Sequence, residues 1–191
     1  MQTFSAAYDS YAQAERAVRD LETAGISSAE ISLVANKYVS EKYSDVHDVS
    51  STATGAGVGA AVGGGAGLLA GLGLLAIPGL GPVVAAGWLA ATALGAAAGT
   101  ATGGVVGALV DSGTSEPTAH VYSEAVRRGG TLVTVRTDHA AAQVQSILDG
   151  HQPIDPMVRR TEYERAGWSA FDPKAPPYRP DGSQIERMRR Q

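Results

Sequence analysis

The sequence predicts an α+β fold made of two β-α-β halves that are separated by a long apolar insertion. Alternating apolar residues at 3–8 and 30–36 flank an amphipathic segment, which indicates the first half. The run TLVTVRT at 131–137, with amphipathic segments before and after it, indicates the second half. Residues 49–110 carry no charged side chain and separate the two. Together these three observations define the fold class.

Boundary signals delimit the elements of the first half. Ser10 can cap a helix, and Gln13 stands three places later, as in a capping box. Apolar residues then recur at helical spacing until Gly25, which ends the helix. We therefore expect a strand at 3–8, a helix that ends at this glycine, and a second strand at 30–36.

The second half begins after the insertion. Residues 117–128 have a proline near the start, an apolar stripe and two arginines in the last turn, all of which favour a helix. A glycine pair ends this helix before the strand at 131–137. Asp138 can cap a further helix, which Gly150 closes.

Residues 153–160 have the composition of a last strand. Pro156 would remove one donor from its ladder, so this strand belongs at the edge of a sheet. A β-α-β half followed by a second one that ends in an edge strand is the ferredoxin-like arrangement, which we therefore predict. The boundaries that follow are 1–36 for the first half, 37–52 for a polar linker, 53–110 for the insertion, 111–160 for a helix with the second half, and 161–191 for a C-terminal arm.

The insertion carries two rows of small residues at a spacing of four. In a helix, residues at this spacing lie in one shallow row, along which another backbone can approach closely. Prolines and glycines at 78–82 separate the rows, so we predict a glycine-zipper helical hairpin that self-associates along them. The first row is Gly55, Gly59, Gly63, Gly67 and Gly71, and the second is Gly87, Ala91, Gly95, Gly99, Gly103 and Gly107.

Helices that are apolar all round must be buried, either in protein or in lipid. The two segments, of about 22 and 28 residues, would be roughly 33 and 42 Å long, enough to cross a hydrocarbon layer of about 30 Å. Residues 1–20 show no basic region followed by an apolar stretch, so we expect no secretory signal. We expect the hairpin to enter a membrane from its cytoplasmic face. The alternatives are the core of a soluble cytoplasmic homo-oligomer and, third, a disordered segment.

Residues 161–191 are too polar and too rich in proline to form a core of their own. Trp168, Phe171 and Tyr178 stand out among them, and we interpret these aromatic side chains as anchors that dock on another surface. The alternative interpretation is a loose tail with incidental aromatic residues.

No motif for catalysis, a cofactor or a metal ion stands out. The chain has no cysteine, which excludes disulfides and thiolate chemistry. The pattern G-x-G-x-x-A at 71–76 follows no strand pattern, and the four histidines share no ligand spacing. A net charge of -4 without a concentrated basic stripe argues against nucleic acid as a partner. We expect a protein that is not an enzyme and that needs no cofactor.

Small and apolar positions of the first half carry a family resemblance. They are Tyr8, Ala14, Val18, Leu21, Gly25, Ile26, Ile31, Ser32, Leu33 and Val34. Together with GGTLVTVRTD at 129–138 and the glycine-rich interruption, they make residues 1–150 resemble bacterial general-stress and low-temperature-induced proteins. The resemblance implies a stress-induced, non-enzymatic protein and transfers no active site. The arm lies outside it.

The resulting hypothesis is a stress-associated structural protein whose hairpin inserts into a membrane and self-associates. Its expected partners are membrane lipid and other copies of the chain. One alternative is a soluble homo-oligomer that buries the hairpin in its core. A second is a ferredoxin-like module that senses a small molecule, which rests on analogy of fold alone.

Overall fold

The computed structural model describes residues 2–36, 73–77, 80–89, 92 and 104–175. The predicted linker, most of the predicted hairpin and the end of the arm lie outside these residues. The elements in chain order are β1 (Gln2–Tyr8), α1 (Tyr11–Thr23), β2 (Ile31–Asn36), β3 (Gly73–Ile77), β4 (Gly81–Ala86), α4 (Val105–Asp111), α5 (Glu116–Arg127), β5 (Thr131–Thr137), α6 (Ala141–Gly150) and α7 (Pro156–Arg165).

The strands form one antiparallel sheet in the order β1-β5-β2-β4-β3. β5 lies between β1 and β2 and pairs with both, so that Val135 stands opposite Phe4 on one side and Ile31 on the other. β1 and β2 of the first half therefore lie one strand apart, and β5 of the second half occupies the position between them. This arrangement of strands and helices confirms the predicted α+β class.

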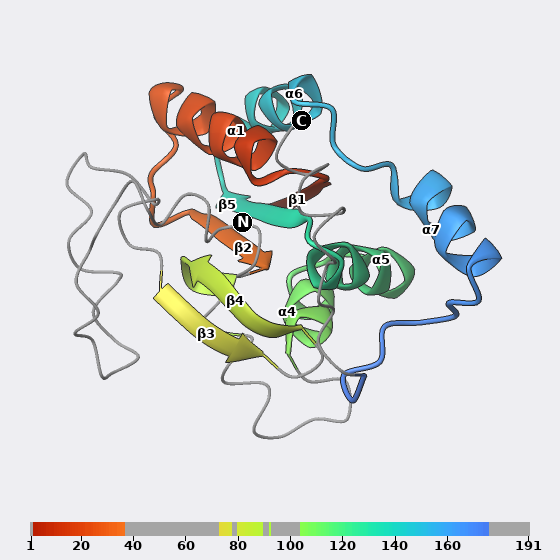
Figure 1. Cartoon of the computed structure of the whole chain (residues 1–191). Coiled ribbons are helices and arrows are strands. Elements are labelled where there is room, and N and C mark those ends of the chain that lie inside the picture. The colour runs from red at the N-terminus through yellow and green to blue at the C-terminus, as the bar shows by residue number, and fades with distance from the viewer. Residues whose placement is uncertain (1, 37–72, 78–79, 90–91, 93–103, 176–191) are drawn as a thin grey trace.

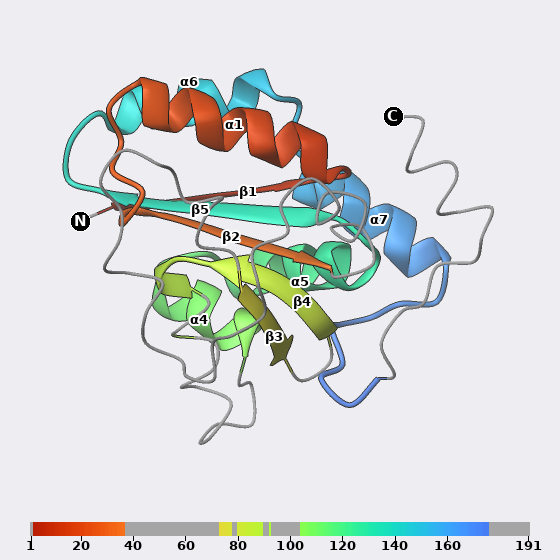
Figure 2. The ribbon, with the colours of Figure 1, turned by 60° about the vertical axis from the view of Figure 1, so that its left-hand side comes forward.

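Helices cover both faces of the sheet (Figure 1). α1 and α6 lie on one face, and α4 and α5 lie on the other, as the side view in Figure 2 shows. The core under α1 contains Leu21 and Val133, whereas the core under α5 contains Val126 and Leu132. Neighbouring residues of β5 thus point into opposite cores, as the alternation of a strand requires.

The capping box of α1 forms as predicted. Gln13 Oε1 accepts a hydrogen bond of 3.2 Å from the backbone N–H of Ser10, whose own hydroxyl accepts from the N–H of Gln13. Gly25 has φ of +89°, a conformation that glycine adopts without penalty, and it follows the helix end. α6 differs from the expectation, because Ala140 rather than Asp138 is its N-cap and no side chain caps it.

The predicted strand at 153–160 is wrong, because α7 begins inside it. Asp155 Oδ1 accepts two backbone hydrogen bonds in the first turn of α7, and Pro156 occupies the start of the helix. A helix cap and a proline outweigh the weak strand composition. One backbone hydrogen bond of 2.7 Å, from Ile154 N–H to the carbonyl of Ala7, lies where the edge strand was expected. Among the described residues, no strand takes the fourth position of a ferredoxin-like unit.

The predicted helical hairpin is also wrong around its turn, where residues 73–77 and 81–86 form strands. β3 and β4 lie on the two sides of the predicted break and pair with each other as antiparallel strands. On its other side β4 pairs with β2, where Ala86 stands opposite Leu33. The open edge of β2 offers hydrogen-bond partners that only an extended segment can use. Gly87, with φ of +88°, then turns the chain out of the strand.

The last part of the insertion forms α4, where a helix was predicted. Four of its side chains are buried in the core under α5, together with Val83 and Leu89 from the earlier part of the insertion; they are Val105, Val106, Ala108 and Leu109. These parts of the uncharged run therefore belong to the core of the chain itself. Across the residues that the structure describes, no helix combines the length and the apolarity needed to span a bilayer.

Candidate functional site

Two of the predicted helix-packing residues lie in the described part of the chain. Gly87 follows β4, and Gly107 is half-buried in α4, so the two stand on different elements and do not form one helical row. The other predicted positions lie outside the described residues, namely Gly55, Gly59, Gly63, Gly67, Gly71, Ala91, Gly95, Gly99 and Gly103.

Gly87 allows a close backbone approach within the chain. A Cβ atom at this position would lie 2.3 Å from the carbonyl oxygen of Ile31 and 2.7 Å from Cα of Ser32. Beside it, the buried hydroxyl of Ser32 donates a hydrogen bond of 2.7 Å to the carbonyl of Ala86. Because Gly87 has no side chain, the end of β4 can pack directly against β2.

β3 is the outermost strand on the insertion side of the described sheet. Its sequence GLLAI contains no charged residue and no proline. β4 pairs with its inner side, and none of the strands that the structure describes pairs with its outer side. Natural edge strands are commonly protected by lysine, proline or a bulge, because an open edge is a template for pairing. The outer edge of β3 is therefore a candidate surface for self-association.

Trp88 links the insertion to β5, which belongs to the second half of the chain. The guanidinium carbon of Arg136, in β5, lies 4.0 Å from the centroid of the indole ring. Trp88 itself packs against the core under α5. A stacked guanidinium of this kind contributes about 0.5–2 kcal/mol, depending on its exposure to solvent.

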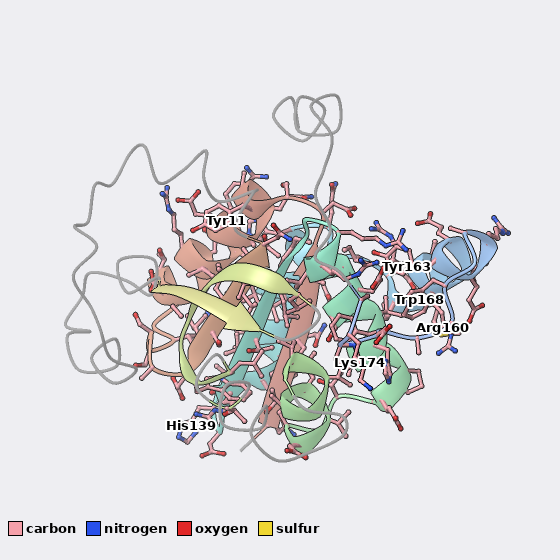
Figure 3. All side chains as sticks on the ribbon, turned by 60° about the horizontal axis from the view of Figure 1, so that its bottom comes forward. Tyr11, His139, Arg160, Tyr163, Trp168 and Lys174 are labelled. Carbon is pink, nitrogen blue, oxygen red and sulfur yellow. The ribbon has the colours of Figure 1, made fainter. Side chains whose placement is uncertain are left out.

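Two of the three predicted anchors dock on their own chain, and Tyr178 lies outside the described residues. Phe171 is 6% exposed and belongs to the core under α5. The ring of Trp168 meets that of Tyr163, from α7, edge-on with centroids 5.5 Å apart. Figure 3 shows Tyr163 and Trp168 on the side of the molecule where the arm passes α7.

A buried carboxylate lies beneath this docking surface. Glu124, in α5, is 1% exposed. Its Oε2 accepts a hydrogen bond of 2.8 Å from Arg127, and its Oε1 accepts bonds of 2.6 Å from both Arg127 and Arg128. The hydrogen bond to Glu124 raises the pKa of Arg127, so its guanidinium stays charged. Arg128 also lies over the ring of Tyr163, at 4.3 Å from its centroid.

A second ion pair holds α7 to the first half. Arg159 donates two hydrogen bonds, of 2.7 and 2.8 Å, to the two carboxylate oxygens of Asp9. These bonds raise the pKa of Arg159, whose guanidinium also faces Tyr163. Burial raises the pKa of Tyr163, which therefore stays protonated. The cluster of Glu124, Arg128, Arg159, Tyr163 and Trp168, which we call the arm cluster, packs α7 and the arm against α5.

The arm cluster positions segments of the chain rather than reactive groups. Both oxygens of Glu124 are occupied by arginine. Within the described ranges, no three histidine or acidic side chains come together in a way that could hold a metal ion. Sequence reasoning missed Glu124, although its spacing of three and four to the arginines is typical of helical ion pairs. No sequence signal showed that this carboxylate is buried.

Comparison of the chain with models of known protein families, with curated proteins and with solved structures found no match.

Proposed function

We propose that this chain is a non-enzymatic structural protein that associates with further copies of itself through its uncharged insertion. The observation that carries the proposal is the outer edge of β3, an uncharged strand edge within the uncharged run. The stress-associated role comes from the resemblance of residues 1–150 alone. We also propose that the core is a modified ferredoxin-like unit, which the order β1-β5-β2 and the pairing of α1 with α6 on one face support.

Hydrogen bonding favours a second copy as the partner of β3. A strand edge that is buried without a partner leaves backbone groups unsatisfied, and each costs about 1–3 kcal/mol. Antiparallel pairing of β3 with β3 of another copy would satisfy both edges at once. Such a two-fold interface is self-complementary and joins two sheets into one.

Sedimentation in detergent-free buffer tests this interface. The parent chain is expected to sediment as a dimer or larger oligomer. The double variant Leu74→Lys and Ala76→Lys places charges on the edge strand and is expected to sediment as a smaller species. Met157→Lys is the matched control, since Met157 is 77% exposed and belongs to α7, which lies apart from β3 in Figure 1. A monomeric parent would contradict the proposal, as would an oligomer of unchanged size in the double variant.

Sedimentation also tests whether the glycine rows contribute to self-association. Gly63→Leu combined with Gly99→Leu is expected to reduce assembly more than Leu69→Ala does, because added bulk blocks a close backbone approach whereas a shortened side chain does not. Equal oligomer size in the double variant and the parent would argue against a role for these rows.

Membrane insertion is the second candidate function, and the absence of charge from residues 49–110 favours it. Flotation with vesicles of phosphatidylcholine and phosphatidylglycerol tests it. A membrane protein is expected to float with the vesicles and to resist an alkaline carbonate wash. Recovery of all the protein in the vesicle-free fraction would remove this candidate and leave self-association to be judged by sedimentation.

A further inference from the structure

The outer edge of β1 lies at the end of the sheet opposite β3. β5 pairs with the inner side of β1. The carbonyl of Ala7 accepts a hydrogen bond from Ile154, so it points away from β5. Backbone groups along a strand point to the two edges in alternation. The N–H and C=O groups of Thr3 and Ser5 therefore also point outward, and both residues are partly exposed.

A cavity of about 320 Å³ opens beside this edge. Ser5 of β1 lies on its inner side, Gln145 and Asp149 of α6 line it from one helical layer, and Tyr122 of α5 lines it from the other. The segment that leads into α7 lines it with Pro153, Ile154, Asp155 and Pro156. We call this cavity the β1 slot. It lies at the strand position that the sequence assigned to residues 153–160.

Charge in the β1 slot has one sign. Asp149 and Asp155 line it, and no lysine, arginine or histidine does so among the residues that the structure describes. Asp155 Oδ1 caps α7, and Asp149 Oδ1 accepts a hydrogen bond of 2.9 Å from Gln145. The ion pairs within the described ranges involve other acids. The two carboxylates are therefore available to a cation that enters the slot.

The charges of both carboxylates act on the hydroxyl of Tyr122. Burial, followed by the charges of Asp155 and Asp149, raises the pKa of its hydroxyl to about 12. The hydroxyl is therefore protonated at neutral pH and lies 3.4 Å from the carbonyl oxygen of Ser5. This distance exceeds that of an ordinary hydrogen bond between two oxygens, so a better-placed donor could replace the tyrosine hydroxyl.

We propose that the β1 slot binds an extended basic peptide of a partner protein, which adds as a strand to the outer edge of β1 and places lysine or arginine beside Asp149 and Asp155. Strand addition uses backbone hydrogen bonds for affinity and alternate side chains for specificity. This site is independent of the β3 edge and of self-association.

The two helical layers determine which side chains of such a peptide meet which wall. Ala6 belongs to the core under α1 and α6, whereas the hydroxyl of Ser5 lies 3.3 Å from that of Thr114, on the side of α4 and α5. Peptide side chains that face α6 therefore meet Gln145 and Asp149. A sequence that alternates basic with small polar residues fits both walls.

A second copy of β1 fits this edge less well. Two-fold pairing would bring Asp149 and Asp155 of one copy near the same carboxylates of the other, and like charges on neighbouring strands are destabilising. A small organic cation would satisfy the carboxylates but would leave the outward N–H groups of Thr3 and Ser5 without a protein partner. Peptide binding and competition by arginine amide distinguish these occupants.

Fluorescence anisotropy with the full-length chain tests the proposal. The probe is a fluorescein-labelled peptide, Thr-Arg-Thr-Arg-Thr-Arg-Thr, titrated at low salt. We expect saturable binding that weakens as salt is added. The double variant Asp149→Asn and Asp155→Asn is expected to bind at least about tenfold more weakly, and Asn at position 155 can still cap α7. Asp111→Asn is the matched control, because Asp111 is exposed and does not line the slot.

Backbone methylation of the probe separates strand addition from simple ion pairing. Methyl groups on alternate amides block one edge of the peptide. One of the two alternate sets is expected to abolish binding and the other to leave it within about threefold. Equal binding of both sets would overturn the proposal, as would the absence of saturable binding at about 1 mM protein. Competition by arginine amide as effective as that by the peptide would instead identify a small-cation site.

Two further comparisons cover the remaining outcomes. A peptide with glutamate in place of arginine should not bind, and equal affinity for it would overturn the assigned charge preference. Leu74→Lys with Ala76→Lys, which tests the β3 edge, is expected to leave peptide affinity unchanged. Failure of self-association and failure of peptide binding are therefore distinguishable.

Discussion

The backbone amide of Phe171 donates a hydrogen bond of 3.1 Å to Nδ1 of His120. The bond joins the arm to α5 across 51 residues of sequence. It requires a ring whose Nδ1 carries no proton, because that nitrogen is the acceptor. The phenyl ring is buried beside this bond, so Phe171 itself belongs to the folded core.

Phe171→Ala is expected to detach this part of the arm. Loss of a buried phenyl ring costs about 3–5 kcal/mol when the site does not collapse. We expect this loss mainly to weaken the docking of the arm on α5. Limited trypsin digestion should cleave after Lys174 faster in the variant than in the parent. Met157→Ala, at an exposed position of α7, should leave the cleavage rate unchanged. The same rate in Phe171→Ala and the parent would show that the ring does not hold the arm.

Glu124→Gln is expected to destabilise the fold strongly. The variant removes the charge that two arginines share at 2.6 Å. Breaking a buried pair costs about 3–5 kcal/mol, and the loss here should lie at the lower end, because the arginines left behind are 17% and 34% exposed. Urea unfolding at one protein concentration measures the loss. Glu15→Gln is the control, because it breaks the Glu15–Arg19 pair, also 2.6 Å long but with Arg19 65% exposed. Such a surface pair contributes at most about 1 kcal/mol. Similar losses of unfolding free energy in the two variants would mean that the buried pair contributes no more than the surface pair does.

Gly87→Ala is expected to destabilise the chain more than Gly113→Ala. Both glycines have positive φ, +88° and +101°, so both substitutions strain the backbone by about 1–2 kcal/mol. Only at Gly87 does the new Cβ also overlap backbone atoms of β2, whereas nothing lies within 4 Å of a Cβ at Gly113. Overlap in a packed site adds about 1–3 kcal/mol. Thermal unfolding of the two variants checks the order, and a Gly113→Ala variant that melts lower would reverse it.

Stability is expected to fall as the pH rises from about 10 to 12. An exposed tyrosine in the unfolded chain ionises near pH 10, whereas the pKa of Tyr122 is raised to about 12 in the fold. The folded state holds this proton more tightly, so the stabilisation is complete below pH 10 and is lost as the pH approaches 12. The difference amounts to about 2–3 kcal/mol.

Tyr122→Phe tests the assignment of this pH dependence. The variant should lose less stability than the parent between pH 9 and pH 11.5, measured by urea midpoints. It should still lose some, because burial also raises the pKa of Tyr8. Identical pH profiles for variant and parent would assign the effect to other groups.

Local signals predicted those elements whose causes lie close together in the sequence. The capping box of Ser10 and Gln13 and the helix-ending Gly25 act within a few residues, and α1 forms between them. The pattern at 131–137 also predicted β5, because its alternation matches burial on two faces.

The predictions that failed depended on distant partners. The insertion supplies strands at β3 and β4 because β2 has an open edge beside them, which no pattern within the insertion reveals. Residues 153–160 enter α7 because Asp155 caps a helix there, while Ile154 keeps one bond to β1. The burial of Glu124 depends on an arm about 40 residues farther along the chain.

By itself the sequence determined the α+β class, the first half and the place where the uncharged run turns, because capping, turn chemistry and alternation are local. Only the tertiary structure decided that Gly87 packs inside one chain, that Phe171 docks on α5 and that the β1 edge is lined by acids. The physical reason is that a strand edge, a buried charge and a cavity are each created by segments that meet only after the chain has folded.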